Sequence, residues 1–508
     1  QTVGGALNAS GGSYLVMAFA DTREAAFFKD VSGQGNHWTP NNLDYRDSLP
    51  DSPANNFATL NPLSSYSTIA LSEGNLKASE SANVGRTAFS SIALQSGKWY
   101  FEVYVQTAGN YVGIGLSDDS YTGSSYTGDS ANSYGYLSHT GNKYNNGAAV
   151  SYGATFTAGD IVSAAFDVTT GTLTFYKNGA SQGTAFTSIS LEQFFTVTAR
   201  NSVVIANFGQ DSTFAGAKPM GAYTDDNSIG NFQYAPPAGY LALCTANLPT
   251  PTIIDGSEHF NTVLWTGDSV DNRNITGIGF DADFTWFKAR SNANSNGLAD
   301  TVRGNSAPNM LSSNSTNAEF DWTGIFKGHI TDGFTVGTDS AINFSGQTYA
   351  SWNWKAGTAF SNSAGVNGAT IASTGQVNTT AGFSIVSYVA NGTNTATVSH
   401  GLSIEPKIVI QKNRSAASDW LIYTDLVDGS DDYLLLNSTA AKGNAAGGAT
   451  ATVFNSWDRT SGNNMIAYCF ADVEGYSKAG RYTGNGNADG PFVYTGHRPS
   501  FLLIKRTD

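Results

Sequence analysis

The sequence predicts an all-β protein made of serial antiparallel β-sandwich, jelly-roll-like domains. Only 13% of its 508 residues are charged, whereas Gly (56), Phe (29) and Tyr (24) are plentiful. This composition suits short strands joined by turns and is unfavourable for helices. A chain of this length exceeds the size of one hydrophobic core, so we expect three or four domains.

The strongest strand pattern runs from residue 97 to residue 179. In its first strand, residues 98–105, every second residue is apolar on one face, which is the period of a half-buried strand. In residues 112–116 the apolar side chains alternate with Gly113 and Gly115, so we expect another backbone or a partner sheet to cross this face closely. Thr169-Thr170-Gly171 predicts a hairpin between the last two strands.

These motifs resemble those of the SPRY (B30.2-like) family. The family's strand Gly-Lys-x-Tyr-aromatic-Glu-Val is matched at residues 97–103, its Val-Gly-x-Gly strand at 112–115, and its Gly-Asp hairpin ending in Asn-Gly at 159–179. Residues 203–210 resemble the family's closing strand. The resemblance covers residues 57–215 and implies a concanavalin-like, bent antiparallel sandwich that binds proteins or glycans through surface loops and is not an enzyme.

Within this region residues 117–153 form a polar insertion rich in Tyr, Ser, Gly and Asn. This is the composition of recognition loops, because Tyr offers a large contact area at low entropic cost. We predict ligand binding by its tyrosines, namely Tyr121, Tyr126, Tyr134, Tyr136 and Tyr144. The alternative is an ordered loop whose tyrosines cap the sandwich.

The flanks of the SPRY-like region carry weaker signals. Residues 1–56 are predicted to supply extra strands or an attachment, and the stretch 30–37 resembles the turn that opens many laminin-G-like jelly rolls. A calcium role for Asp30 and a turn closed by its side chain are both open. Residues 216–251 hold five of the 13 prolines, so we expect an extended linker.

From residue 252 onward the chain contains an internal repeat. In each copy a strand, a polar turn and a second strand ending in Lys and Arg follow one another. The cations are Lys288/Arg290, Lys412/Arg414 and Lys505/Arg506. We therefore predict one β-sandwich repeat at 252–360, a second at 361–478 and the start of a truncated third at 479–508, and we expect the chain to be a fragment.

The sequence carries no signature of catalysis, such as a nucleophile elbow, a phosphate loop or paired cysteines with metal spacing. We therefore predict no enzyme activity, no metal and no cofactor. The repeat cations are predicted to be structural, with an acidic-glycan groove as the alternative. The acidic cluster 425–432 is predicted to be a solvated turn, with Ca²⁺ binding as the alternative. Cys244 and Cys469 are predicted to be isolated buried thiols, with a disulfide between them as the alternative.

A net charge of −14 argues against nucleic-acid partners, and no apolar run is long enough to span a membrane. The SPRY-like region followed by repeats resembles structural proteins of marine tailed bacteriophages, notably at Ala242–Pro249 and Tyr349–Gly357. The resemblance implies a homo-oligomeric virion protein, such as a tail fibre, that contacts other virion subunits and recognises a host glycan or protein at the particle surface. The alternatives are an architectural capsid, tail or filament component, and a secreted bacterial adhesin or polysaccharide depolymerase.

Overall fold

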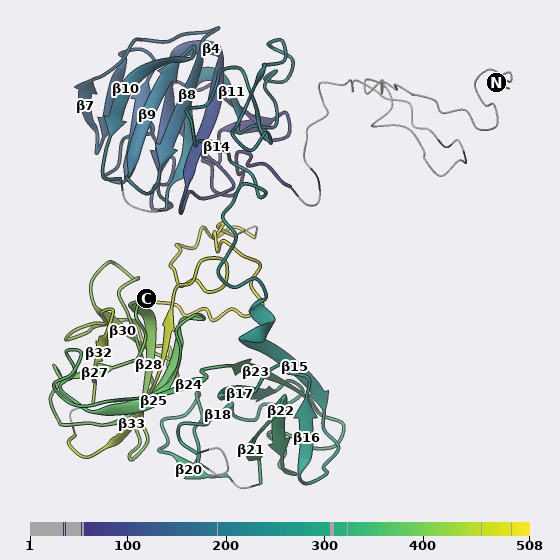
Figure 1. The fold of residues 1–508 in the computed structure, drawn as a ribbon, viewed down its shortest axis with the longest axis vertical. Helices are drawn as coiled ribbons and strands as arrows, with labels where there is room; N and C mark the ends of the chain where they lie inside the picture. The colour runs from purple at the N-terminus through teal and green to yellow at the C-terminus, as the bar shows by residue number, and fades with distance from the viewer. Residues whose placement is uncertain are drawn as a thin grey trace, which may run out of the picture. The chain divides into compact units, whose positions relative to one another are not determined.

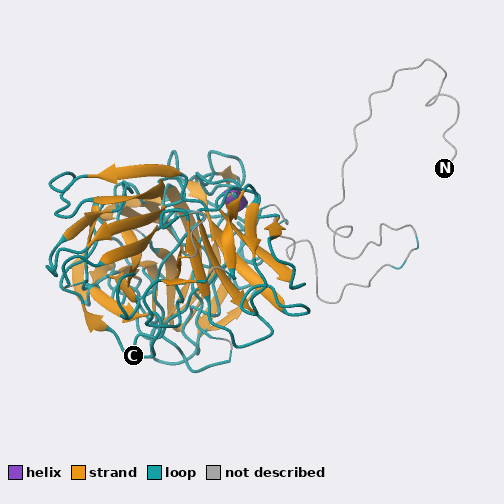
Figure 2. Ribbon diagram, turned by 90° about the horizontal axis from the view of Figure 1, so that it is seen from below, coloured by secondary structure: helices purple, strands orange, loops and turns teal. Residues whose placement is uncertain are grey.

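The structure, a computed structural model, describes residues 34, 36, 52, 55–189, 192–304, 309–322, 324–458, 460–488 and 490–508. This part of the chain is strand and loop, with one 3-10 turn, η2 (Gly256–Glu258), and no α-helix (Figure 2). The all-β prediction is therefore confirmed. No helix in these ranges is long and apolar enough to cross a bilayer. Nearly all of residues 1–56 lie outside the described residues, including all of the turn predicted at 30–37 except residues 34 and 36.

The described chain divides into two compact units, Gln1–Pro249 and Thr250–Asp508. The strands of the first unit are β1 (Ala70–Ser72), β2 (Lys77–Glu80), β3 (Arg86–Phe89), β4 (Lys98–Ser117), β5 (Ser133–Leu137), β6 (Asn142–Asn145), β7 (Ala148–Ser151), β8 (Ile161–Asp167), β9 (Thr172–Lys177), β10 (Ala180–Phe186), β11 (Phe194–Asn207), β12 (Tyr223–Thr224), β13 (Asn231–Phe232) and β14 (Leu241–Ala242).

Two long strands, β4 and β11, pair with each other in the first unit (Figure 1), and each exchanges its outer neighbours along its length, so both belong to two layers. The first half of β4 pairs with β8, which continues to β9 and β10, and its second half pairs with β5, which continues to β6 and β7. The register between β4 and β11 shifts around Asn201, which has a φ of +46°. A Cβ on Gly109 would lie 1.9 Å from the Asn201 carbonyl oxygen, so the bend requires glycine there.

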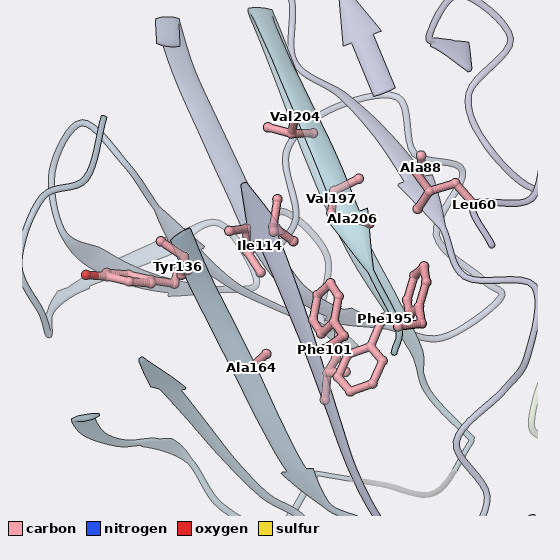
Figure 3. Packing of buried hydrophobic residues seen from close by; sticks show 14 of the residues in the cluster. Leu60, Ala88, Phe101, Ile114, Tyr136, Ala164, Phe195, Val197, Val204 and Ala206 are labelled. Atoms are coloured by element: carbon pink, nitrogen blue, oxygen red, sulfur yellow. The ribbon is translucent and has the colours of Figure 1, made fainter. Parts of the chain in front are cut away.

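The core of the first unit lies between the two layers and is aromatic. The ring centroids of Phe101 and Phe195 are 4.1 Å apart, and those of Phe101 and Phe208 are 5.5 Å apart. Figure 3 shows the first two rings facing one another beside Ile114 and Val197. Because Phe101 belongs to the apolar face that the sequence predicted, the period-two pattern located this core.

The glycine face predicted in β4 is covered by another backbone. Gly135 on β5 pairs with Gly115, and a Cβ on Gly135 would lie 2.0 Å from the carbonyl oxygen of Thr127. Residues 121–130 therefore cross the outer side of β4 and β5 at a distance that only glycine permits.

Residues 216–251 were expected to be an extended linker. Up to the unit boundary at Pro249, they instead form part of the first unit. They add β14 parallel to the start of β4, and β12 and β13 form a small hairpin. Phe232, Ala242 and Cys244 pack with Tyr100 and Ala165 in a second apolar cluster. Proline did not prevent this packing, because the stretch pairs through three short strands whose own residues are not proline.

The second unit contains, in its described residues, β15 (Phe260–Thr266), β16 (Arg273–Thr276), β17 (Phe284–Ala289), β18 (Gly297–Asp300), β19 (Asn309–Met310), β20 (Phe320–Asp321), β21 (Phe326–Ile330), β22 (Gly333–Val336), β23 (Thr348–Trp354), β24 (Thr358–Asn362), β25 (Ser373–Asn378), β26 (Phe383–Val389), β27 (Thr397–Ser399), β28 (Pro406–Asn413), β29 (Leu421–Thr424), β30 (Asp432–Leu435), β31 (Gly443–Asn444), β32 (Val453–Asn455) and β33 (Asn464–Ala471).

The internal repeat is visible in the strand order. One sheet runs β15-β23-β17-β18, and the corresponding part of the next runs β26-β33-β28-β29. Each has a small partner sheet, in which β16 pairs with β22 and β27 pairs with β32. Trp354 on β23 pairs with residues of β15 and β17, as Phe470 on β33 pairs with residues of β26 and β28.

The two repeats share a hydrophobic core. Phe284 of β17 stacks on Tyr468 of β33 with ring centroids 4.4 Å apart, and Trp354 lies 6.1 Å from Phe470. The two larger sheets therefore pack on each other, while each also packs on its own small sheet through a separate cluster. The second unit is thus one stack of layers, whereas the sequence predicted sandwiches in series.

A buried charge network joins the repeats. The Arg303 guanidinium donates to Asp300 at 2.5 Å and to Glu319 at 3.0 Å, and its side chain is 1% exposed. The Tyr468 hydroxyl donates to Asp300 at 2.7 Å, and Arg414 pairs with Glu319 at 2.8 Å. Because Tyr468 and Arg414 belong to the second repeat, this network fixes how the repeats face each other.

The motif lysines of the repeat hold loops. Lys288 donates to the carbonyl oxygens of Asn292 and Asn294 at 3.3 and 2.6 Å. Lys412 is fully buried and donates to those of Thr316 and Ser418 at 3.0 and 2.8 Å. Burial lowers the pKa of Lys412 to about 8. Both lysines contact backbone oxygens, which supports the predicted structural role of the motif.

The predicted third repeat has no strand among the described residues of 479–508. Phe501 packs on Trp352 and Trp354 with centroid distances of 5.7 and 5.4 Å. Leu502 and Ile504 are each 65% exposed. A strand needs a neighbouring backbone for its hydrogen bonds, and the apolar run 501–504 pairs with none within the described residues.

We predict that Arg303→Met destabilises the second unit by about 3–5 kcal/mol, because it leaves the carboxylate of Asp300 buried without its charge partner. Calorimetry of the full chain measures the effect. The control is Arg506→Met, whose side chain is 79% exposed, so the stability of the chain should stay unchanged. Equal effects of the two substitutions would contradict the role assigned to the network.

Candidate functional site

The insertion at 117–153 contains three strands and a segment that crosses the sheet. It contributes β5, β6 and β7, which extend the sheet beyond β4, and the segment 121–130 that crosses the outer face. The predicted recognition loop is therefore a layer fixed on a sheet, and its tyrosines differ in position and burial.

Buried threonines hold the crossing segment in place. The backbone N–H of Thr127 donates to the Thr198 hydroxyl at 2.9 Å, and the Thr127 hydroxyl lies 3.0 Å from that of Thr196. The Thr87 hydroxyl donates to the Ser125 carbonyl oxygen at 2.8 Å. Since all four threonines are fully buried, these hydrogen bonds exclude water and fix the height of the segment above the sheet.

Two of the predicted tyrosines are buried and form hydrogen bonds within the domain. The Tyr121 hydroxyl accepts from the Ser125 N–H at 3.0 Å and donates to the Tyr126 carbonyl oxygen at 3.1 Å, and its side chain is buried. Tyr136 is buried in the core, where its hydroxyl donates to the Ala154 carbonyl oxygen. Figure 3 shows the Tyr136 ring lying away from the rings of Phe101 and Phe195, with its hydroxyl outermost.

Two others come together on the outer face. The rings of Tyr126 and Tyr144 meet edge to face with centroids 5.4 Å apart, and Tyr126 meets Tyr111 of β4 at 6.2 Å. His139 stacks on Tyr111 at 5.3 Å, and the Arg200 guanidinium of β11 lies 5.1 Å from the centre of the same ring. We call these five residues, Tyr111, Tyr126, His139, Tyr144 and Arg200, the aromatic–arginine patch.

The patch has a buried residue at its centre and partly exposed residues around it. Tyr111 is 8% exposed, Tyr126, Tyr144 and Arg200 are half-buried, and His139 is exposed. Burial raises the pKa of Tyr126, and the neighbouring carboxylate of Asp129 raises it further, so its phenol stays protonated at neutral pH. Burial and the positive charge of Arg200 lower the pKa of His139, so its imidazole is neutral at pH 7.

Arg200 forms no ion pair with a carboxylate among the described residues. Its Nε donates to the side chain of Asn83 at 2.9 Å and to the Asn83 carbonyl oxygen at 3.2 Å. Arg86 stands nearby over the ring of Tyr66, 4.1 Å from its centre, and donates to the Ser124 carbonyl oxygen. The patch therefore contains one cation without an ion pair among the described residues, Arg200, while the Asp129 carboxylate lies beside Tyr126.

The fifth predicted tyrosine, Tyr134, lies apart from the patch. It alternates with Gly135 along β5 and therefore points to the opposite side of the sheet, where its ring meets Phe186 at 5.3 Å. The predicted set thus divides into two patch residues, two buried residues and one on the other side. Ligand binding by Tyr126 and Tyr144 stays a prediction.

Sequence reasoning missed Tyr111, His139 and Arg200. Tyr111 lies two residues before Gly113, so strand alternation places it on the glycine face. Arg200 pairs with Tyr111 across β4 and β11, and this register is not visible in one sequence. His139 follows β5 on the same face as Leu137, and only the stacking on Tyr111 distinguishes it.

The acidic cluster 425–432 is occupied by the chain's own groups. Lys407 pairs with Asp425 at 3.0 Å, and Lys442 bridges Asp428 and Asp432 at 2.7 Å each. In the described part of the chain no group of three or more His, Cys, Asp or Glu residues is placed to hold a metal ion. Asp432 is fully buried, so the cluster differs from the predicted solvated turn in being paired with lysines and only partly exposed.

Comparison with known proteins defines the class of the first unit. The SPRY domain family matches residues 98–211, so the SPRY prediction is confirmed. Beyond this domain, the chain belongs to the family described as "Domain of unknown function (DUF7483)", which matches residues 255–508, half of the chain.

Curated relatives match somewhat less than a third of this chain. Ran-binding protein 10 of Danio rerio is 34% identical over 163 residues, covering 29% of this chain and 27% of that protein. Ran-binding protein 9 of Xenopus tropicalis is 34% identical over 162 residues, covering 29% of each. The chain thus spans less than a third of these relatives. A crystal structure of a human SPRY domain matches with a TM-score of 0.24 and 21% identity over 27% of this chain and 94% of that one.

These relatives correct the functional prediction. They are animal proteins named for binding Ran, so the prediction of a bacteriophage virion protein is wrong. The predicted location at the particle surface, with virion subunits and a host glycan or protein as partners, is wrong for the same reason. The phage resemblance rested on short motifs such as Ala242–Pro249 and Tyr349–Gly357, and shared motifs on a common architecture do not determine function.

We predict that Thr198→Val destabilises the first unit by about 1–3 kcal/mol, because it leaves the buried N–H of Thr127 without an acceptor. Hydrogen exchange at the Thr127 amide should accelerate in the same variant. The matched control is Thr184→Val at an exposed position of β10, where neither quantity should change. Unchanged exchange at Thr127 in the first variant would show that the threonines do not hold the segment.

Proposed function

We propose that this chain is a binding protein without enzyme activity, and that its SPRY domain recognises a protein partner through the aromatic–arginine patch. The observation that carries the proposal is the convergence of three tyrosines, a histidine and an arginine on one rigid face. Tyr and Arg are enriched among the residues that dominate binding energy at protein interfaces.

The construction of the patch supports this role. Arg200 and Tyr111 are pre-positioned by Asn83 and by the ring stack, so little side-chain freedom is lost when a partner binds. The crossing segment that carries Tyr126 is tied down by buried hydrogen bonds. A preformed aromatic surface favours an extended or looped segment of another protein as its ligand.

Charge indicates the chemistry of the partner segment. Arg200 has no carboxylate partner among the described residues, and Arg86 contacts only carbonyl oxygens and the Tyr66 ring there. A partner segment bearing Asp or Glu would form ion pairs with both Arg200 and Arg86. We propose an acidic segment of a protein rather than Ran in particular, because the names of the relatives describe whole proteins of which this chain spans less than a third.

For the second unit we propose a rigid carrier of two tandem repeats. The shared core and the buried Arg303 network support a fixed relation between the repeats. This unit would present the SPRY domain without contributing chemistry of its own.

The test is selection of binders from a randomised peptide library with the full chain, followed by calorimetric titration of enriched peptides. We expect enrichment of Asp and Glu. Arg200→Gln and Tyr126→Ala should each weaken binding by about tenfold or more, since a hot-spot residue contributes upward of about 1–2 kcal/mol.

The matched control is Lys98→Gln. Lys98 is a 46% exposed cation that already pairs with Asp167 at 3.4 Å and lies outside the patch, so peptide binding should be unchanged. Peptides that bind equally to wild type, Arg200→Gln and Tyr126→Ala would place recognition elsewhere on the chain.

A further inference from the structure

The first half of β4 carries a buried carboxylate that holds another part of the chain. Glu102 is fully buried, and each of its oxygens accepts a backbone hydrogen bond. Oε2 accepts from the N–H of Gln233 and Oε1 from that of Tyr234, both at 2.9 Å. Asn207 and the Tyr100 hydroxyl also donate to it, both at 3.3 Å.

The segment that Glu102 holds is residues 229–240, which we call the strap. The strap covers an apolar surface on the outer side of β4 and β8, where Phe232 meets the Tyr100 ring edge to face at 5.0 Å. It contains Pro236 and Pro237, which donate no backbone hydrogen bond. A second buried carboxylate, Asp225, holds its flanks by accepting from the N–H of Ile229 at 2.8 Å and of Ala242 at 3.0 Å.

No cation contacts the Glu102 carboxylate among the described residues. The titratable groups that face it are the phenols of Tyr100 on β4 and Tyr234 on the strap. The neighbouring strands contribute neutral groups, Ser163 on β8 and Asn207 on β11. On β9, Tyr176 lies edge to face with Tyr100 at 6.5 Å.

We propose that the strap is a proton-responsive element that closes over β4 more tightly at mildly acidic pH than at alkaline pH, because closing buries Glu102 away from any positive charge. Opening the strap would expose Tyr100 and Phe232 together with the carboxylate. The strap is thus coupled to pH through one side chain, at a place separate from the aromatic–arginine patch.

The direction of the pH dependence follows from the environment of the Glu102 carboxyl group. Burial raises the pKa of Glu102 from 4.5 to about 7, although the four hydrogen-bond donors oppose the shift. In the open state the group would titrate near its ordinary value, so the closed state binds the proton more tightly. Closing is therefore most favourable below pH 4.5, and this advantage is lost as the pH rises through about 7.

The test is hydrogen exchange of the full chain at several pH values, corrected for the intrinsic exchange rate of each amide. Protection of the Gln233 and Tyr234 amides should fall by about tenfold or more between roughly pH 5.5 and pH 8.5. Glu102→Gln should abolish this dependence. Tyr100→Phe, which keeps the carboxylate but removes one donor to it, should move the midpoint to higher pH.

The matched control is Asp225→Asn, which weakens the second carboxylate anchor. We expect lower protection of the Ile229 and Ala242 amides at every pH, with the pH dependence at Gln233 and Tyr234 retained. Protection at Gln233 and Tyr234 that does not change with pH in the wild type would overturn the proposal. A dependence that persists unchanged in Glu102→Gln, or a midpoint that stays fixed in Tyr100→Phe, would also overturn it.

Discussion

The bend shared by β4 and β11 is the constraint on which the first unit depends. Both strands pass from one layer of the sandwich to the other, and the chain makes this passage where Gly109 meets the backbone of Asn201 without a side chain between them. The bend divides β4 into two halves with different neighbours. The half after it forms the floor of the aromatic–arginine patch, and the half before it carries Glu102 and the strap. One strand therefore supports two sites that have no side chain in common.

The sequence predicted those features that depend on local alternation. The apolar face of β4, the crowded glycine face and the hairpin between β8 and β9 all follow from a period of two within single strands. The patch depends on register, which places Arg200 opposite Tyr111 although 89 residues separate them in the sequence (200 − 111). The strap depends on a pairing between β4 and β14 that a count of prolines does not reveal. Local periodicity therefore located the scaffold, and only tertiary pairing located both sites.

The second unit shows the same division between local and tertiary information. The repeat was recognisable because corresponding strands have similar sequences and similar landmarks. The packing of the two sheets on each other requires strands that are buried on both faces, and β17 meets that requirement with Phe284 and Trp286 on one side and Phe287 on the other. A serial sandwich would leave one of these faces to solvent. The sequence signal for the shared core was that β17 is apolar on both faces. In the second repeat Tyr468 of β33 supplies the side chain that packs against it.

The scarcity of charge gives each unpaired cation unusual weight. With 26 basic and 40 acidic residues, most cations of this chain can find a carboxylate, and several do so in the described part, including Lys98, Lys177 and Lys442. Arg200 is held in place by an amide and an aromatic ring, so its charge stays uncompensated while its geometry is fixed. The arrangement suits an interface, where electrostatic complementarity selects the partner and the preformed ring stack limits the entropy lost on binding.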